Sequence, residues 1–326
     1  MNRRYSARPW ALPRALAGLT LALASGAALA YPTKPITIIV PFAAGTINDM
    51  VARDLAQVLT TIAKQTVTVE NRVGAEGTIG ALAMINAAPD GHTLMVSSNS
   101  LTVYDPLLKK NIPYDPGKDL VPVCAAGRVS LTVNVTGSGS IKTLPELAAA
   151  AKAQPGKLTF AYTSTWMRLA GELFQQVTGT KMVGAPYKSS VTGLTDVSSG
   201  QVDSIFIDRA SAAPFYESGK VRPLAVAGQR RLPPIANIPT TAEAGLPGFT
   251  VQPWFGIYMS GRTPAALQRQ VIDTVAQATR GPDMLANQAS RSLDPFDLCG
   301  EALARHLQQE SDTLGDVVRR AGIEKE

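Results

Sequence analysis

The feature that most constrains this chain is a regular alternation of strand and helix patterns. It begins with the β-branched run Ile36–Val40, which is typical of a strand covered on both faces. Small residues then interrupt the run, and beyond them apolar residues recur at three- and four-residue spacing, as in a helix that packs one face on a sheet. Those spaced residues are Val51, Leu55, Val58, Leu59 and Ile62. The opening therefore predicts a strand, a loop and a helix.

The same alternation continues to the end of the chain. Thr143–Glu146 has the pattern of a capping box, and Thr263-Pro264 has the pattern of a helix start. An amphipathic helix is predicted over 303–321. Alternating strands and helices predict an α/β fold with mainly parallel sheets and right-handed crossovers. Further strands are predicted near 67–70, 93–97, 158–161, 204–207, 224–227 and 255–260.

The first thirty residues have the composition of an export signal. Four arginines and no acidic residue precede the apolar run Ala15–Leu23, and the tripeptide Ala28–Ala30 follows it. This order predicts a secretory signal peptide, residues 1–30, that is cleaved after Ala30. The apolar run is shorter than the roughly 20 residues that a membrane-spanning helix needs.

The positive charge of the chain belongs largely to this leader. The whole sequence has 31 basic and 25 acidic residues, and the leader holds four of the basic ones, so 27 basic and 25 acidic residues remain with a net charge of +2. A charge of that size is ordinary for a solvated surface. We therefore expect no nucleic acid and no anionic membrane as partner.

The remaining 296 residues are enough for two domains, each with its own core. We expect lobe 1 to comprise 31–128 and 254–326, with the C-terminal helices packed on it, and lobe 2 to comprise 129–253. Two cysteines, Cys124 and Cys299, are present. Two buried free thiols are the default expectation, and a disulfide is the alternative that export to an oxidising compartment permits.

Small and polar residues follow several predicted strands, where parallel sheets bind ligands. Ala43–Asp49 allows backbone N–H groups to approach a ligand, and the helix that starts near Asn48 adds a partial positive charge. Ser97–Ser100 offers hydroxyl groups and an amide. These features indicate an anion site, although such residues also serve simply as turns and loops.

A third cluster, Tyr162–Thr165, precedes a helix that carries Arg168. This arginine has the geometry to bind a carboxylate with two hydrogen bonds. Its spacing also allows an ion pair with Glu172, one helical turn further on, and this second alternative is slightly favoured.

The sequence is poor in the groups that catalysis needs. Its two histidines, His92 and His306, stand in no metal-ligand spacing. We find no nucleophile elbow, dinucleotide fingerprint or phosphate loop after a strand. We therefore expect neither an enzyme nor a metal or other cofactor.

Ordered blocks of the mature sequence resemble the Bug family, the solute-binding receptors of tripartite tricarboxylate transporters. The first block runs from Pro35 to Gly45 and continues with Asp49 and Ala52-Arg53. The later blocks are Val69–Ala75, Ala87–Leu94, Pro113–Pro116 with Lys118-Asp119, Leu169–Phe174, Pro186–Lys188, Gly200–Asp203 and Pro239–Gly248. The resemblance thus covers nearly the whole mature chain.

This resemblance implies a two-lobed periplasmic-binding-protein (Venus-flytrap) fold with a ligand cleft between the lobes. It implies a monomer in the periplasm that captures a small organic acid for the membrane permease subunits of a tripartite tricarboxylate-type transporter. Asp208 falls where the family often has an acidic or amide side chain that faces the ligand. The implied ligand-binding residues are Phe42, Ala43, Ala44, Gly45, Thr46, Asn48, Asp49, Ser98, Asn99, Thr163, Ser164, Thr165, Trp166, Arg168 and Asp208.

The sequence departs from the family pattern in both binding loops. Thr46 replaces the usual second glycine, and its Cβ restricts the approach of the backbone to a ligand. The usual glycine-rich stretch of the second lobe is shorter and reads Thr163–Arg168, in which Trp166 and Met167 either line an apolar part of the ligand site or pack the loop on its lobe.

Two other functions fit the same sequence. One is a ligand-sensing receptor of the same fold that reports to an extracytoplasmic sensor domain. The other is an exported hydrolase or lyase that uses Asp49 or Asp208 as a base, and the lack of a nucleophile paired with a base disfavours it.

Overall fold

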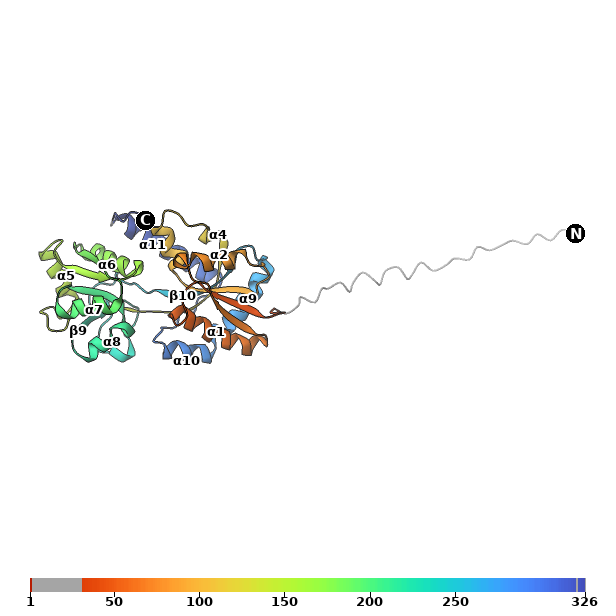
Figure 1. The fold of residues 1–326 in the computed structure, drawn as a ribbon, viewed down its shortest axis with the longest axis horizontal. Coiled ribbons are helices and arrows are strands. Elements are labelled where there is room, and N and C mark those ends of the chain that lie inside the picture. Colours follow the sequence, from red (N-terminus) through yellow and green to blue (C-terminus); the bar gives the residue numbers. More distant parts are fainter. Residues whose placement is uncertain (2–30, 321, 326) are drawn as a thin grey trace.

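The computed structural model describes residues 31–320 and 322–325, together with Met1. The predicted signal peptide therefore lies outside the described residues. The described chain forms two five-stranded sheets, each flanked by helices, and the two bodies lie side by side (Figure 1). The predicted α/β two-lobed architecture is confirmed.

The first sheet has the strand order β2-β1-β3-β10-β4. Strand β1 runs parallel to β2 and β3, whereas β10 runs antiparallel to β3 and β4. Its strands are β1 (Ile36–Val40), β2 (Val67–Asn71), β3 (Thr93–Ser98), β4 (Leu120–Arg128) and β10 (Trp254–Ser260).

The second sheet has the order β7-β6-β8-β5-β9. Strand β6 runs parallel to β7 and β8, and β5 runs antiparallel to β8 and β9. Its strands are β5 (Leu131–Thr136), β6 (Thr159–Tyr162), β7 (Val183–Pro186), β8 (Ser204–Asp208) and β9 (Val221–Val226).

Both sheets are mixed rather than mainly parallel. In each sheet one strand arrives directly from the other lobe and runs against both of its neighbours: β10 in the first sheet and β5 in the second. A crossing strand of this kind makes no βαβ unit within its new sheet, so the rule that strands alternating with helices run parallel does not apply to it.

Apolar helix faces cover both sides of the first sheet. On one side Val51 and Leu55 of α1 (Ile47–Ala63) and Val271 of α9 (Ala265–Arg280) pack with the strand residues Ile38 and Ile257, and α10 (Pro282–Ser290) closes this side. The other side holds α2 (Thr78–Asn86), whose Met84 contacts the layer that includes Tyr258. Burial on both faces explains the continuous β-branched run of β1.

The second sheet is covered in the same manner. The helices α5 (Leu144–Ala153) and α6 (Thr165–Thr178) pack on one face around Phe160, Phe174 and Phe206, while α7 (Ser190–Ser199) and α8 (Arg209–Glu217) cover the other face. The short helical turns of the molecule are η1 (Ala75–Gly77), η2 (Ser100–Tyr104), α3 (Asp105–Leu108), α4 (Pro116–Asp119) and η3 (Pro233–Ile235).

The predicted capping box at Thr143 forms in part. The Thr143 hydroxyl accepts the backbone N–H of Glu146 at 3.3 Å, but the Glu146 carboxylate accepts the N–H of Lys142 rather than that of Thr143. The helix starts at Leu144, as the pattern indicates.

The C-terminal helix α11 (Glu301–Arg320) packs on both lobes, not on lobe 1 alone. Its Leu303 joins the core of the first sheet, whereas Val317 joins the core of the second. Leu314 and Val318 pack with Leu169 of α6. In Figure 1 α11 lies above the junction between the two bodies.

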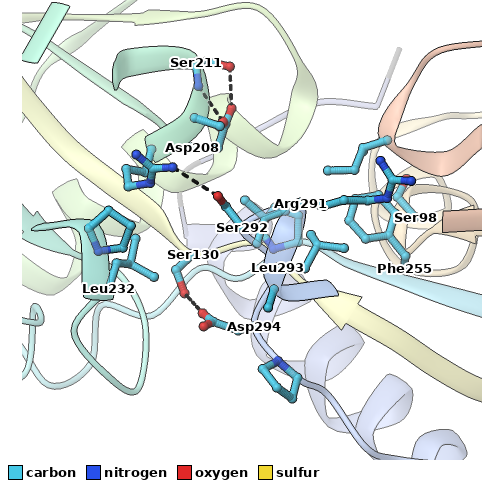
Figure 2. A pocket seen from close by; sticks show the side chains of 18 of the residues that line it. Ser98, Ser130, Asp208, Ser211, Leu232, Phe255, Arg291, Ser292, Leu293 and Asp294 are labelled. Carbon is cyan, nitrogen blue, oxygen red and sulfur yellow. Dashed lines mark hydrogen bonds between the residues drawn. The ribbon is translucent and has the colours of Figure 1, made fainter. Parts of the chain in front are cut away.

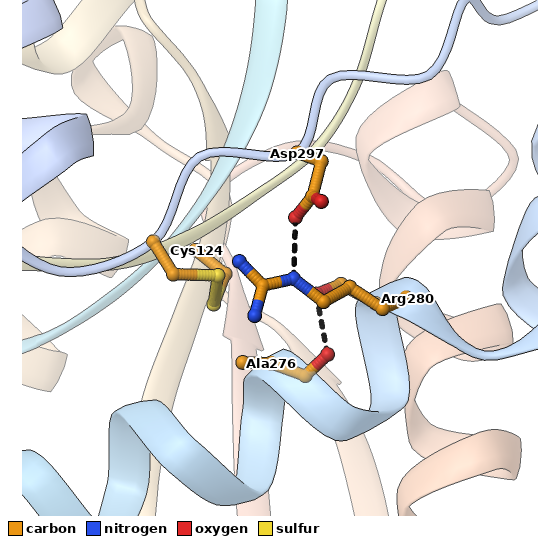
Figure 3. The surroundings of a disulfide bond; sticks show 6 residues. Cys124, Ala276, Arg280 and Asp297 are labelled. Atoms are coloured by element: carbon orange, nitrogen blue, oxygen red, sulfur yellow. Dashed lines mark hydrogen bonds and ion pairs between the residues drawn. A yellow bond between two sulfur atoms is a disulfide. The ribbon is translucent and has the colours of Figure 1, made fainter.

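A disulfide bond joins Cys124 of β4 to Cys299, just before α11 (Figure 3). It decides the alternative that the sequence left open, and the expectation of free thiols is wrong. Next to it Arg280 Nε donates to the Asp297 carboxylate at 2.7 Å. The segment that leads into α11 is therefore fastened to lobe 1. In the part of the chain that is described, no helix has both the length and the apolar character of a membrane span.

Candidate functional site

A cavity of about 690 Å³ lies between the two lobes, where the chain crosses from one sheet to the other (Figure 2). Lobe 1 contributes the start of α1, the end of β3 and the end of α10; lobe 2 contributes the starts of α6 and α8 and the loop after β9. The lining residues are Ile47, Asn48, Ser98, Asn99, Val129, Ser130, Trp166, Asp208, Arg209, Ala210, Ser211, Arg230, Leu232, Pro233, Pro234, Pro253, Phe255, Leu285, Ala289, Arg291, Ser292, Leu293, Asp294 and Pro295.

The start of α1 reaches the cavity through Ile47 and Asn48. Thr46 is the N-cap residue, but its hydroxyl donates to the Ala43 carbonyl at 2.8 Å instead of capping the helix. Gly45 has φ +81°, a conformation that side-chain-bearing residues adopt at a cost. Of the ligand-binding residues predicted in the first loop, Asn48 lines the cavity, whereas Phe42, Ala43, Ala44, Gly45, Thr46 and Asp49 do not.

Asp49 holds the shape of this loop. Its buried carboxylate accepts hydrogen bonds from the Gly45 N–H, from the Asn71 amide and from the guanidinium of Arg53, each at 2.9 Å. The hydrogen bond from Arg53 is the main cause that lowers the pKa of Asp49 to about 2, with Gly45 and Asn71 adding to it against the effect of burial. A carboxylate with all these partners stabilises the loop and stays ionised.

The end of β3 places Ser98 and Asn99 at the cavity wall. The hydroxyl groups of Ser98 and Ser100 lie 2.9 Å apart. The fully buried Asn99 donates its side-chain N–H to Glu310 of α11 at 2.8 Å, and Glu310 also accepts the Trp254 indole N–H at 2.8 Å. Burial raises the pKa of Glu310 to about 7.

In lobe 2 the predicted loop Thr163–Arg168 meets the cavity only through Trp166. The Thr163 hydroxyl donates to the Met167 sulfur at 3.1 Å, and Ser164 is the N-cap residue of α6, which begins at Thr165. Trp166 also packs against the cores of its own lobe, and its contact with a ligand stays a prediction.

Arg168 does not line the cavity. Burial raises the pKa of Glu172, and the positive charge of Arg168 opposes that rise. This interaction agrees with the slightly favoured alternative, in which Arg168 pairs along its own helix.

Asp208 ends β8 and caps α8 at the cavity wall. Its two carboxylate oxygens accept the backbone N–H and the hydroxyl of Ser211, both at 2.8 Å (Figure 2). The carboxylate is thereby fixed in direction, with the start of α8 beside it.

Three arginines that were not predicted as ligand-binding residues also line the cavity: Arg209, Arg230 and Arg291. Arg230 forms an ion pair with Asp294 at 2.6 Å, and Asp294 also accepts the Ser130 hydroxyl at 2.7 Å. The only sequence signal for any of them was the position of Arg209 directly after Asp208, since the others come from segments without a strand-end motif.

Comparison with known proteins identifies the family. The model of the tripartite tricarboxylate transporter family receptor matches residues 51–323. The chain belongs to this receptor family. It is 32% identical to the protein BugT of Bordetella pertussis over 295 residues, which cover 90% of each chain.

Solved structures extend the likeness to the whole fold. Rpa4515 of R. palustris, solved with adipate, is 29% identical with a TM-score of 0.74 and covers 91% of this chain and 100% of its own. MatC from Rhodopseudomonas palustris, solved with bound malate, is 28% identical with a TM-score of 0.68 and covers 88% of this chain and 100% of its own. The predicted family is confirmed.

Proposed function

We propose that this receptor captures a small organic carboxylate in the cavity between its lobes. The single observation that carries the proposal is the cavity itself, because it joins groups of both lobes that can donate hydrogen bonds to a carboxylate: the Asn48 amide and the Ser98 hydroxyl on one side and the guanidinium of Arg209 on the other. The adipate and malate complexes of Rpa4515 and MatC support the same ligand class. A site made of both lobes couples binding to their closure.

In this proposal lobe 1 comprises residues 31–128 and 254–326, and lobe 2 comprises residues 129–253. Support comes from the two sheets, since the strands of each sheet come from one of these sets. The crossing segments meet where the Val129 N–H donates to the Pro253 carbonyl at 2.7 Å. Because α11 packs on both lobes, its contacts with α6 must shift when the lobes open.

We further propose that the protein is exported to the periplasm and acts there as a monomer. It catalyses no reaction and delivers its ligand to the permease subunits of a tripartite tricarboxylate-type transporter. The basic and apolar leader supports export. The family description supports the transport partner.

The test is a thermal-shift screen of residues 31–326 against mono-, di- and tricarboxylic acids, with amino acids and sugars for comparison. A ligand at 100 times its dissociation constant adds about 2.7 kcal/mol of stability. We expect at least one carboxylate to raise the melting temperature. A response to none of the acids, with a folded protein, would contradict the proposal.

A pair of matched variants locates the binding. Ala210 is exposed and lines the cavity, so Ala210→Trp fills the cavity without disturbing a core. Ala149 is also exposed but lies on α5 outside the cavity. Ala210→Trp should abolish the shift that the acid produces, and Ala149→Trp should keep it. An unchanged shift in Ala210→Trp would place the ligand elsewhere.

A further inference from the structure

We propose that Arg209 sets the ligand class of the cavity by binding the carboxylate of an organic monoanion that carries an apolar body. This inference rests on the proposed function and narrows it. It predicts a preference for one carboxylate over two and for an apolar chain or ring over a second polar group.

The other two arginines of the cavity already have carboxylate partners. Arg291 forms an ion pair with Asp54, in which its Nη2 donates at 2.7 Å. Arg230 donates to Asp294 from Nε at 3.1 Å and from Nη2 at 2.6 Å. Their charges are neutralised within the protein and attract a ligand anion only weakly.

Arg209 differs from both. Its Nη2 donates to the Ser292 hydroxyl at 3.1 Å, which is a neutral partner. No Asp or Glu of the described residues forms an ion pair with it, although Asp208 precedes it, because the Asp208 oxygens face Ser211. A guanidinium carries five N–H donors, so Arg209 retains donors for a carboxylate while it contacts Ser292.

The remainder of the cavity favours an apolar ligand body. We define the apolar wall as the lining residues Leu232, Pro233, Pro234, Leu285, Ala289 and Leu293. A second carboxylate against this wall would lose its hydration without gaining a cationic partner. At the other end of the cavity, α1 already faces the ionised carboxylate of Asp49. One ligand carboxylate is therefore compensated and a second is not.

The experiment compares three probes of the same chain length by calorimetry on residues 31–326: hexanoate, its neutral amide hexanamide, and the dianion adipate. We expect hexanoate to bind about tenfold more tightly than either of the others, since a hydrogen bond between two charged groups is stronger than one to a neutral amide. Arg209→Gln should reduce hexanoate affinity to that of hexanamide and leave hexanamide unchanged.

The ratio of hexanoate affinity to hexanamide affinity distinguishes two roles of Arg209: binding of the ligand's charge, and contact with Ser292 of the other lobe. If Arg209 acted only through Ser292, Arg209→Gln would weaken both probes equally, and the inference would be overturned. Arg305→Gln is the matched control, because it removes the same charge from an exposed position on α11 outside the cavity. It should leave all three affinities unchanged.

The outcome also separates this inference from the proposed function. Tighter binding of adipate than of hexanoate overturns the inference and leaves the capture of a carboxylate intact. A failure of every acid in the wider screen contradicts the proposed function itself.

Discussion

The side-chain amide of Asn99 donates to the carboxylate of Glu310 at 2.8 Å, which links the cavity wall to a helix that packs on both lobes. The same carboxylate accepts the Trp254 indole at the start of β10. Tyr104, Tyr258 and His306 face it as well. None of these groups neutralises the Glu310 carboxylate as Arg53 neutralises that of Asp49. Burial therefore disfavours the ionised form of Glu310.

We predict that the stability of the protein falls as pH rises from about 5 to 8. Burial raises the pKa of Glu310 from 4.5 to about 7, so the group favours folding below 4.5 and this contribution is lost as pH rises through 7. The loss amounts to about 3 kcal/mol. Glu310→Gln should remove this dependence in denaturant melts at pH 5 and pH 8.

The matched control is Glu301→Gln on the same helix, where the carboxylate is 87% exposed. It should retain the full dependence on pH. Burial also lowers the pKa of His306 below its ordinary 6.5, which adds a dependence of the opposite sign below about pH 6.5, so the difference between wild type and Glu310→Gln is the quantity to compare. Equal slopes for these two proteins would refute the prediction.

The sequence predicted the elements whose own residues carry a periodic pattern and missed strands whose residues carry none. The β-branched run of β1 and the helix spacing of α1 carry their own signal, because both faces of that strand are buried. Strand β4 contains Pro122, and β7 reads Val-Gly-Ala-Pro; neither has a strand pattern, yet both pair along their length. Their pairing comes from the sheet that receives them.

The site shows the same division. Asn48, Ser98 and Asn99 were predicted from their position after strands, whereas Trp166 and Asp208 were implied by the family resemblance, and the structure brings these five to one cavity. Arg230, Arg291 and Asp294 come from loops distant in sequence, and no local pattern states which loops will meet there. That the five predicted residues contact a ligand stays a prediction.

Reduction of the disulfide should destabilise the protein. The bond joins Cys124 and Cys299 across 175 residues, so it restricts the unfolded chain strongly, and removing such a bond costs about 2–5 kcal/mol. We expect a reductant to lower the melting temperature of the wild type. The double variant Cys124→Ala, Cys299→Ala should melt lower and should not respond to the reductant. A response of that variant would assign the effect to the reductant itself.

Glu76 occupies a left-handed conformation, with φ +53°, between Gly74 and Gly77. Its ion pair with Lys109, at 2.6 Å, involves a side chain that is 79% exposed and contributes little. Glu76→Gly should therefore stabilise the protein by about 1 kcal/mol relative to Glu76→Ala, which loses the same ion pair but keeps the strained backbone. Equal melting of the two variants would show that the turn carries no strain.

Asp49 gives a dependence on pH of the opposite sign to that of Glu310. Its pKa in the folded state is about 2, below the ordinary 3.8, so it stabilises the protein above pH 3.8 and loses this contribution as pH falls through 2. Asp49→Asn should cost about 2 kcal/mol at pH 7, measured by denaturant unfolding. The difference from wild type should shrink as the pH is lowered toward 2, since the wild-type carboxylate is then protonated too. A constant difference across this range would mean that Asp49 stabilises its loop by packing and hydrogen-bond geometry rather than by charge.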